Sequence, residues 1–572
     1  MRLNVSKSKN STSLYVIKST WENGVHSSKI VEKLGTYAEL KEKLGDRDPY
    51  EWAKGHIAEL NRLEKEGSEP AVLTKHVPNK QIAKDKQNTF NGGYLFLQRL
   101  YHELGLHKIC DHITKKHSFE YDLDSILSRL LYTRILFPGS KRSACEQSKS
   151  FIEQPNFQLN HVYKALDVIA SESDFIQSKL YQNSLKLSKR NTQVLYYDCT
   201  NYFFETEQEN GLQQYGLSKE HRPNPIVQMG MFMDGDGIPL AFTIHPGNTN
   251  EQITLKPLEK QILSDFQLSK FVVCTDAGLA SQANRQYNAM GDRSFIVAQS
   301  LKLLSKPIQE WALEKNGWCL KHDSCSYNLT EIDEEKHRDS LFYKEQWITI
   351  NGLKQRIIVS YSLAYRNYQR SIREKQITRA LQAIDKGVSK VNKTNQNDYK
   401  RFISQIHCTK EGEIPQKTFL QLNHEAIERE AAFDGYYAVC TTLEDDIITI
   451  LSANKRRWEI EECFRIMKSE FKARPVYLSL DQRIKAHFMT CFLSLVLYRY
   501  LEKRLENRFT CSETISQLRT MNFLQVAGHG YIPTYTRTDF TDALHDAFGF
   551  RTDCGIMTNK AIKKIQKATW CK

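Results

Sequence analysis

Residues 454–474 read NKRRWEIEECFRIMKSEFKAR, and this stretch gives the strongest indication of the fold and its site. Side chains on a helix recur on one face every 3.6 residues, so Arg457, Glu461 and Lys468 are expected to share one stripe. A carboxylate between two cations suits a place where a metal ion and a nucleic-acid phosphate meet. A salt-bridged, solvent-exposed helix face has the same spacing, so the stripe alone leaves both interpretations open.

Two upstream aspartates favour the first interpretation. Asp198 directly follows the apolar run 194–197, and Asp276 stands one residue beyond the apolar run 271–274. Adjacent strand ends and a nearby helix can bring Asp198, Asp276 and Glu461 to one point. Hard divalent cations such as Mg²⁺ or Mn²⁺ prefer such oxygen ligands, and two ions about 4 Å apart assist phosphoryl displacement. For either aspartate alone, a helix N-cap or loop role is the alternative.

Composition narrows the class of protein. The chain has 572 residues, so two to four structural units are expected, and Lys+Arg exceed Asp+Glu by 80 − 67 = 13. This balance favours a polyanionic partner, and 11% aromatic content argues against a disordered basic tail. No signal peptide is visible, and the longest apolar run, 488–498, is too short to span a bilayer. We expect a cytoplasmic protein that does not enter the membrane.

The cysteines predict reduced thiols. There are 13 of them, scattered and without a CxxC pair, which is typical of a reducing compartment. Cys319, His322 and Cys325 have the spacing of three zinc ligands, but no fourth ligand follows at a recognised distance. Ordinary free cysteines are the favoured interpretation.

The periodicity changes along the chain. Strands at 14–18 and 29–33, a turn at Asn23-Gly24, a helix from Pro49 to Leu63 and a linker over 65–91 are expected first. Helical periodicity follows over 94–187, and then short apolar strands alternate with helices over 193–298. A hairpin around Asn351-Gly352, a helix at 365–384 and a strand at 435–441 lie between these strands and the quoted helix. The pattern predicts an α/β fold with a mixed sheet covered on both faces.

We expect five regions: an N-terminal hairpin, helix and linker (1–90), a helical region that binds DNA (91–190), a catalytic core (191–300 and 433–503), a β-rich insertion (301–432) and a C-terminal region with DNA or dimer contacts (504–572). Basic residues run through the helical region and suit site recognition, although a scaffold that touches no DNA has the same pattern: Lys115, Lys116, Arg129, Arg134, Lys141 and Arg142. The basic C-terminal end, which includes Lys572, is typical of a solvated face.

The motifs resemble the DDE transposases of bacterial insertion sequences, in the subgroup with a Tyr-x2-Arg-x3-Glu-x6-Lys signature and a large insertion before the catalytic Glu. The resemblance covers roughly residues 195–498. It is carried by YYDCTNYFFE around Asp198, VVCTDAGLAS around Asp276, His245-Pro246-Gly247-Asn248 with Glu251, Phe433-Asp434-Gly435 and the final helix. Arg457, Glu461 and Lys468 match the signature, whereas its Tyr position holds Asn454.

The resemblance implies a ribonuclease-H-like core in which Asp198, Asp276 and Glu461 bind two Mg²⁺ ions, with Mn²⁺ as a substitute. It also implies that Arg457, Lys468 and, as a helper, Arg465 hold DNA phosphates. Such enzymes cut DNA at terminal inverted repeats, release a 3′-hydroxyl and join it to target DNA as homodimers in a synaptic complex. Relatives form a hairpinned end and stack a flipped base on an aromatic side chain of the insertion. Trp311, Trp318 and Trp347 are candidates for that role, with a core position as the commoner use of Trp.

Two other functions keep the same fold. A ribonuclease-H-class nuclease or resolvase cuts without joining. A decayed copy binds the repeats and regulates, and Asn454 is the one feature that points to it. Intact Asp198, Asp276 and Glu461 argue against decay, because clustered carboxylates without a metal repel one another.

Overall fold

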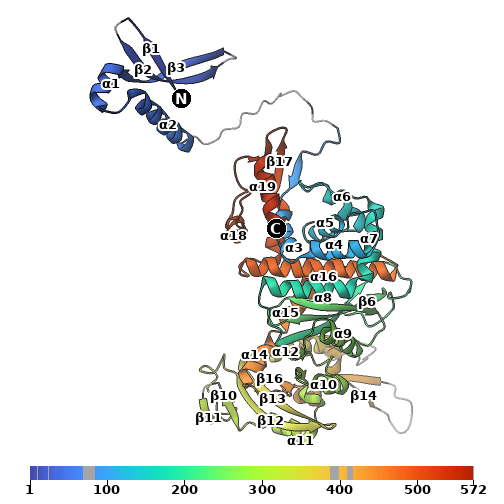
Figure 1. Cartoon of the computed structure of the whole chain (residues 1–572). Helices are drawn as coiled ribbons and strands as arrows, with labels where there is room; N and C mark the ends of the chain where they lie inside the picture. The colour runs from blue at the N-terminus through green and yellow to red at the C-terminus, as the bar shows by residue number, and fades with distance from the viewer. Residues whose placement is uncertain are drawn as a thin grey trace. The chain divides into compact units, whose positions relative to one another are not determined.

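The computed structural model describes residues 1–9, 11–22, 25–67, 81, 84–321, 323–386, 398–408 and 417–570. The chain forms two compact units, Met1–Lys84 and Asp85–Lys572 (Figure 1). In the first, β1 (Arg2–Lys7), β2 (Thr12–Glu22) and β3 (Val25–Thr36) form an antiparallel sheet, followed by α1 (Tyr37–Leu44) and α2 (Pro49–Gly67). The expected hairpin and the helix from Pro49 are confirmed, β1 was not anticipated, and Asn23-Gly24 lies outside the described residues.

The second unit begins with β4 (Thr89–Asn91), which replaces the end of the expected linker. Helices then follow as predicted from the periodicity: α3 (Tyr94–Glu103), α4 (Leu106–Lys116), α5 (Leu123–Leu136), α6 (Lys141–Ser148), α7 (Leu159–Ser171) and α8 (Ser173–Leu187). Three of the six basic residues noted there, Arg129, Arg134 and Lys141, are buried. Their side chains therefore belong to the interior rather than to a basic outer surface.

Ten of the described strands of this unit form a mixed sheet in the order β11-β10-β12-β13-β16-β9-β8-β5-β6-β7. Their bounds are β5 (Val194–Phe203), β6 (Ile226–Asp234), β7 (Pro239–Pro246), β8 (Val272–Thr275), β9 (Ser294–Gln299), β10 (Trp318–Leu320), β11 (Asp323–Tyr327), β12 (Phe342–Ile350), β13 (Leu353–Tyr361) and β16 (Tyr436–Thr441). β5 pairs in parallel with β8, β8 in parallel with β9, and β6 antiparallel to β5. The predicted strands over 193–298 and the mixed sheet are thus confirmed.

Strands from the expected insertion extend this same sheet. β13 pairs with β16, and β16 pairs with β9, so β10 to β13 continue the sheet beyond the β5–β9 strands. The hairpin between β12 and β13 turns at Asn351 and Gly352, whose φ values are +48° and +79°. Asn and Gly tolerate these left-handed angles best, which is why Asn-Gly predicted the turn correctly.

The remaining elements between β5 and residue 480 are α9 (Glu251–Asp265), α10 (Gln282–Asn288), η1 (Leu301–Leu303), α11 (Lys306–Leu313), α12 (Leu363–Asp385), η2 (Tyr399–Phe402), β14 (Ile403–Cys408), β15 (Lys417–Leu422), α13 (His424–Ala431), α14 (Ile447–Lys455), α15 (Trp458–Arg465) and the π-helical turn η3 (Ile466–Glu470). α9 packs on the face of β5 that carries Leu195, Tyr197 and Cys199. α15 packs against β5, and its buried side chains join Tyr196 and Tyr202 in a separate core. Helices therefore cover both faces of the sheet, as predicted.

Helix α16 (Asp481–Arg504) joins the helical layer to the sheet. It packs against α3, α5 and α7 and also against β7, and Figure 1 shows it between α3–α5 and the part of the fold that carries α8 and β6. Phe492 of α16 lies with its ring centroid 4.8 Å from that of Phe242 in β7. The apolar run 488–498 is fully buried in this helix, which confirms that it is a core segment. None of the helices in the described ranges is long and apolar enough to cross a bilayer.

The C-terminal region, weakly patterned in sequence, is well folded. It contains α17 (Cys511–Thr520), β17 (Asn522–Val526), β18 (Gly530–Pro533), α18 (Asp539–Phe548), β19 (Met557–Thr558) and α19 (Asn559–Thr569). β17 pairs with β4, so the two ends of this unit share one sheet. Four of the five terminal lysines, Lys560, Lys563, Lys564 and Lys567, are exposed on α19, as expected for a solvated face, and Lys572 lies outside the described residues.

Candidate active site

The two aspartates come from neighbouring parallel strands. Tyr196 of β5 is in register with Cys274 of β8; Asp198 lies two residues further on within β5, and Asp276 directly follows the last residue of β8, Thr275. Parallel neighbours lie about 4.8 Å apart, and residues two apart on a strand point to the same face. The register therefore places the two residues near each other, and the negative charge of Asp276 is felt at Asp198.

Asp198 is in an environment that disfavours its charge. Burial raises the pKa of its carboxyl to about 6, and the negative charge of Asp276 adds to the rise, whereas Lys219 and Arg457 oppose it. Its Oδ1 accepts a hydrogen bond from the backbone N–H of Cys199 at 2.8 Å. Asp276 Oδ1 accepts one from the N–H of Leu279 at 2.9 Å. A divalent cation would relieve the repulsion of this pair, so its oxygen chemistry fits a hard metal ion.

Glu461 lies on α15, where Arg457 is its nearby cation. Its side chain is 58% exposed, and its carboxylate lies 3.7 Å from Nη1 of Arg457. Within the described residues, the sole group of three acidic, His or Cys ligand atoms that all lie within 4.8 Å of one another is Asp542, His545 and Asp553. Asp198, Asp276 and Glu461 are thus not gathered that closely. Asp198 and Asp276 are close enough for the charge of one to act on the other, whereas the ligand atoms of all three carboxylates do not lie within 4.8 Å of one another.

The C-terminal group is already neutralised by cations. Asp542 accepts hydrogen bonds from Arg537 and Arg551, and Asp553 accepts one from Arg551 at 2.6 Å. Because these carboxylates are paired with arginines, the group forms a salt-bridge network within the C-terminal region.

Lys468 reaches the site from the π-helical turn. Its Nζ donates to Thr200 Oγ1 at 2.7 Å, and Thr200 is two residues beyond Asp198 on the same face of β5. Burial, together with the positive charge of Lys219, lowers the pKa of Lys468 to about 8. The sequence predicted one continuous α-helix, but the chain switches to i→i+5 bonding at Ile466. Lys468 nevertheless faces β5, as expected.

Arg465 does not face the site. Its guanidinium is paired with Glu462 at 2.6 Å and lies 3.7 Å from Glu470, and about half of the side chain is exposed. These contacts are those of a surface ion pair. A role in holding phosphate beside the aspartates is therefore less well supported for Arg465 than for Arg457 or Lys468.

Lys219 is a site residue that the sequence did not reveal. Its Nζ lies 3.1 Å from a carboxylate oxygen of Glu251 at the start of α9. Burial lowers its pKa, but Asp198 and Glu251 raise it more, so the ammonium form is favoured. Lys219 lies in the polar loop between β5 and β6. The one available signal was Glu251, which belongs to a motif of the family resemblance.

Asn454 is buried beneath a tyrosine from the sheet. Its Nδ2 donates to Tyr437 Oη at 3.1 Å, and its Oδ1 has no hydrogen-bond partner among the described residues. Tyr437 belongs to β16, next to β9. The signature position, Asn454, therefore has no phenol of its own but is hydrogen bonded to one.

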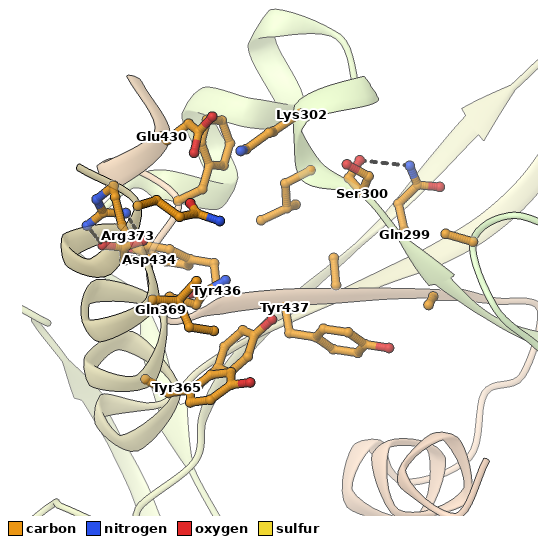
Figure 2. Close-up of a pocket in the computed structure, with 18 of the residues that line it drawn as sticks. Gln299, Ser300, Lys302, Tyr365, Gln369, Arg373, Glu430, Asp434, Tyr436 and Tyr437 are labelled. Carbon is orange, nitrogen blue, oxygen red and sulfur yellow. Dashed lines mark hydrogen bonds and ion pairs between the residues drawn. The ribbon is translucent and has the colours of Figure 1, made fainter. Parts of the chain in front are cut away.

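Tyr437 also lines a pocket of about 460 Å³ that reaches Ala277, the neighbour of Asp276. Figure 2 shows Tyr365 and Tyr437 on one side of this pocket and Lys302 and Glu430 on the other. Arg373 lines it too, with its Nη1 2.6 Å from Asp434 Oδ1. Aromatic faces and cations beside a carboxylate pair are suited to an extended polyanion with bases.

The three tryptophans have different environments. Trp318, the first residue of β10, is fully buried in the hydrophobic core, so it is a packing residue. Trp311 is partly buried against the same core. Trp347 is 41% exposed, with Nζ of Lys354 5.0 Å from the ring centroid. Trp318 is therefore not available to stack on a base, and tyrosines line the pocket beside Asp276.

Other predicted positions have structural roles. His487 is buried, and its Nε2 donates to the carbonyl of Ala473 at 3.0 Å, as expected for a core hydrogen bond. Cys319 and Cys325 are free and exposed, and His322 lies outside the described residues.

Comparison with known protein families decides the class. The family described as "Transposase DDE domain" matches residues 203–497, just over half of the chain. The chain belongs to the DDE transposase family. The match includes Asp276, Glu461 and Lys468 of this transposase, and it begins five residues after Asp198.

Among solved structures, the transposase is similar to the piggyBac transposase in a synaptic complex with hairpin DNA. The identity is 8%, the TM-score is 0.37, and the alignment covers 75% of this chain and 79% of that chain. No curated protein matches the sequence significantly.

Proposed function

We propose that this transposase cuts DNA at the ends of an insertion sequence and joins the ends to target DNA in the cytoplasm. The main support is the carboxylate pair, Asp198 and Asp276, aligned by parallel strands within a basic protein of the DDE family. The order β7-β6-β5-β8-β9, with β6 antiparallel, fits the ribonuclease-H-like core that the resemblance implies. We also propose that the insertion sequence is bacterial and that its transposase belongs to the Tyr-x2-Arg-x3-Glu-x6-Lys subgroup.

The site residues have separate roles in the proposal. Asp198, Asp276 and Glu461 hold two divalent ions, Mg²⁺ or Mn²⁺, with Glu461 brought to the aspartates when DNA is bound. Such ions, when bound, stabilise the attacking and leaving oxygens of an in-line displacement. Arg457 and Lys468 hold phosphate oxygens of the strand, because both cations face Asp198. Lys219 offsets part of the negative charge of Asp198.

Two displacements complete the proposed reaction. Water attacks the phosphorus at the element's end, and the bond to the 3′ oxygen breaks, which frees a 3′-hydroxyl. That hydroxyl then attacks a phosphorus of target DNA, and the 3′ oxygen on the target strand leaves. We propose that residues 191–300 and 433–503 form the core for both steps, with 91–190 and 504–572 contacting DNA or a second protomer. A homodimer would hold two inverted repeats at once.

Strand joining separates this function from that of a nuclease or resolvase. The substrate is a duplex that carries the inverted repeat flanking the coding sequence, pre-cut to expose a 3′-hydroxyl. With Mg²⁺ and a circular target, we expect joined products that disappear when the 3′ end is a dideoxynucleotide. Cleavage of uncut duplex without any joining would favour the nuclease. Repeat binding without turnover in Mg²⁺ or Mn²⁺ would favour the decayed regulator.

A further inference from the structure

A second basic cavity lies between the helical layer and the segment that follows η3. It has a volume of about 420 Å³ and lies among α5, α6 and residues 472–478. Its lining contains Arg134, Lys141, Lys472, Arg474 and His487, and no aspartate or glutamate of the described ranges lines it. Such a one-sided set of side chains suits a small anion.

Lys141 provides the strongest sign of a missing ligand. The residue is 5% exposed, and its Nζ is buried without a hydrogen-bond partner among the described residues. Burial and the charge of Arg134 lower its pKa to about 7, so an ammonium here needs a counter-charge. Buried amines without a partner are costly, and an anion would supply the partner.

The neighbouring groups leave room for that partner. Arg134 donates from Nη1 to the carbonyl of Phe471 at 3.0 Å, and its Nε is buried without a partner among the described residues. Arg474 is paired with Glu220 outside the cavity. His487 gives its Nε2 hydrogen to Ala473, and burial holds its pKa well below the usual range, so it adds no charge.

The backbone adds a further donor surface. Lys141 is the first residue of α6, and Ser140 caps the helix by accepting from the N–H of Ser143 at 3.1 Å. The positive end of a helix favours anions, and it points toward a cavity that already contains two unsatisfied cationic groups.

The cavity lies near the C-terminal end of β5, the strand that carries Asp198. Cζ of Arg474 lies 5.8 Å from the ring centroid of Phe203, and Phe204 forms a β-bridge with Val476. Phe203 is five residues beyond Asp198, which is about 17 Å along a strand. That distance corresponds to about five base pairs of duplex.

We propose that this cavity, built by Lys141, Arg134 and the N-terminus of α6, binds a phosphate group of the transposase's DNA. The DNA origin of the phosphate rests on the proposed function, whereas the pocket for phosphate does not. Lys141 is the central ligand, and Arg134 is the second. A free phosphate ion has the same chemistry, so the experiment compares both sources.

The first measurement is the thermal unfolding midpoint of the full chain in inorganic phosphate and in chloride at matched ionic strength. We expect phosphate to raise the midpoint by about 2 °C in the parent protein. Lys141→Met removes the charge but keeps a similar length, and it should abolish this shift. Lys149→Met is the matched control, since Lys149 ends the same helix region but is exposed and paired with Glu146. Lys141→Gln replaces the Met variant if that variant does not fold.

The second measurement is the affinity for terminal-repeat duplex at several salt concentrations, with and without a 5′-phosphate. We expect Lys141→Met to weaken binding roughly tenfold and to reduce the salt slope by about one, while Lys149→Met changes neither. Loss of the phosphate shift with unchanged DNA affinity would overturn the DNA source and leave a pocket for free phosphate. No phosphate shift in the parent protein would overturn the pocket itself. Neither result depends on whether the protein cleaves DNA, so failure of the proposed function is recognised separately.

Discussion

At the scale of single residues, the site is dominated by the cost of holding charge. Asp198 has a raised pKa because it is buried beside Asp276, and Lys219 and Arg457 offset only part of that cost. The sequence singled out both aspartates because each follows a continuous apolar run, although Asp198 lies within β5 rather than at its end. It did not predict Lys219, since a lysine in a polar loop has no periodicity that would place it over β5.

Asp198→Asn should stabilise the metal-free protein. Between about pH 4 and pH 6 the folded state binds more protons than the unfolded state, so the parent's free energy of unfolding falls as pH rises through this window. Above pH 6 the cost is fully present and amounts to about 3 kcal/mol, from about two pKa units. Urea unfolding in a chelator should show the variant more stable at pH 8 and equal to the parent near pH 3.

Magnesium provides the control for this prediction. Adding Mg²⁺ at pH 8 should stabilise the parent and leave Asp198→Asn unchanged, because the ion needs the carboxylate. Equal stability of the two proteins at pH 8 in a chelator would contradict the charge cost assigned to Asp198.

At the scale of elements, the π-helical turn Ile466–Glu470 carries Lys468, whereas Arg457 and Glu461 precede it, at the N-cap of α15 and within α15. An ideal α-helix predicted the stripe Arg457, Glu461 and Lys468, and two of these side chains face Asp198 while Glu461 remains largely exposed. Sequence periodicity cannot locate a change to i→i+5 bonding, because the apolar residues Ile466 and Met467, buried in this turn, also suit an α-helix. The succession of strands and helices over 193–298, in contrast, followed from apolar runs and turn residues.

Lys468→Met should lower the rate of strand cleavage by about 10²-fold, because a cation that faces the reacting phosphate is lost. Arg465→Met is the matched control, since Arg465 ends α15 directly before the π-helical turn that carries Lys468. Since Arg465 is tied to Glu462 and Glu470, we expect its cleavage rate to stay within about threefold of the parent. Single-turnover cleavage of a labelled repeat duplex measures both rates. Equal losses of rate in the two variants would contradict the assignment of Lys468 to the site and of Arg465 to the surface.

Helix α16 is expected to be the main structural link between the helical layer and the sheet. Phe492→Ala should lower the free energy of unfolding by about 3–5 kcal/mol, since the ring is fully buried against Phe242. Leu185→Ala removes an apolar side chain that is 47% exposed on α8, and it should cost less than about 1 kcal/mol. Chemical denaturation compares them, and similar costs would contradict the assignment of α16 as core.

At the scale of the whole molecule, the ends of the second unit are joined by β4 and β17. The sequence did not predict this, because β4 has three residues and its partner lies more than 400 positions away. Local patterns also gave no sign that strands from residues 301–432 continue the main sheet through β13 and β16. Long-range pairing of this kind depends on the assembled fold rather than on local preference.

Residues 85–572 should fold without the first unit, because the two units are each compact. We expect the fragment to unfold in one cooperative step with the same Mg²⁺ response as the full chain, measured by circular dichroism. An unfolded or aggregated fragment, with the full chain folded in the same buffer, would show that the second unit depends on residues 1–84.

The account depends most on the meeting of three carboxylates around divalent metal. A structure of the full chain with terminal-repeat duplex and Mn²⁺, with anomalous diffraction used to locate the ions, tests this directly. We predict manganese between Asp198 and Asp276, with the carboxylate of Glu461 moved from its place beside Arg457 to contact an ion. Manganese absent from the two aspartates, or Glu461 still distant from them with DNA bound, would contradict the account.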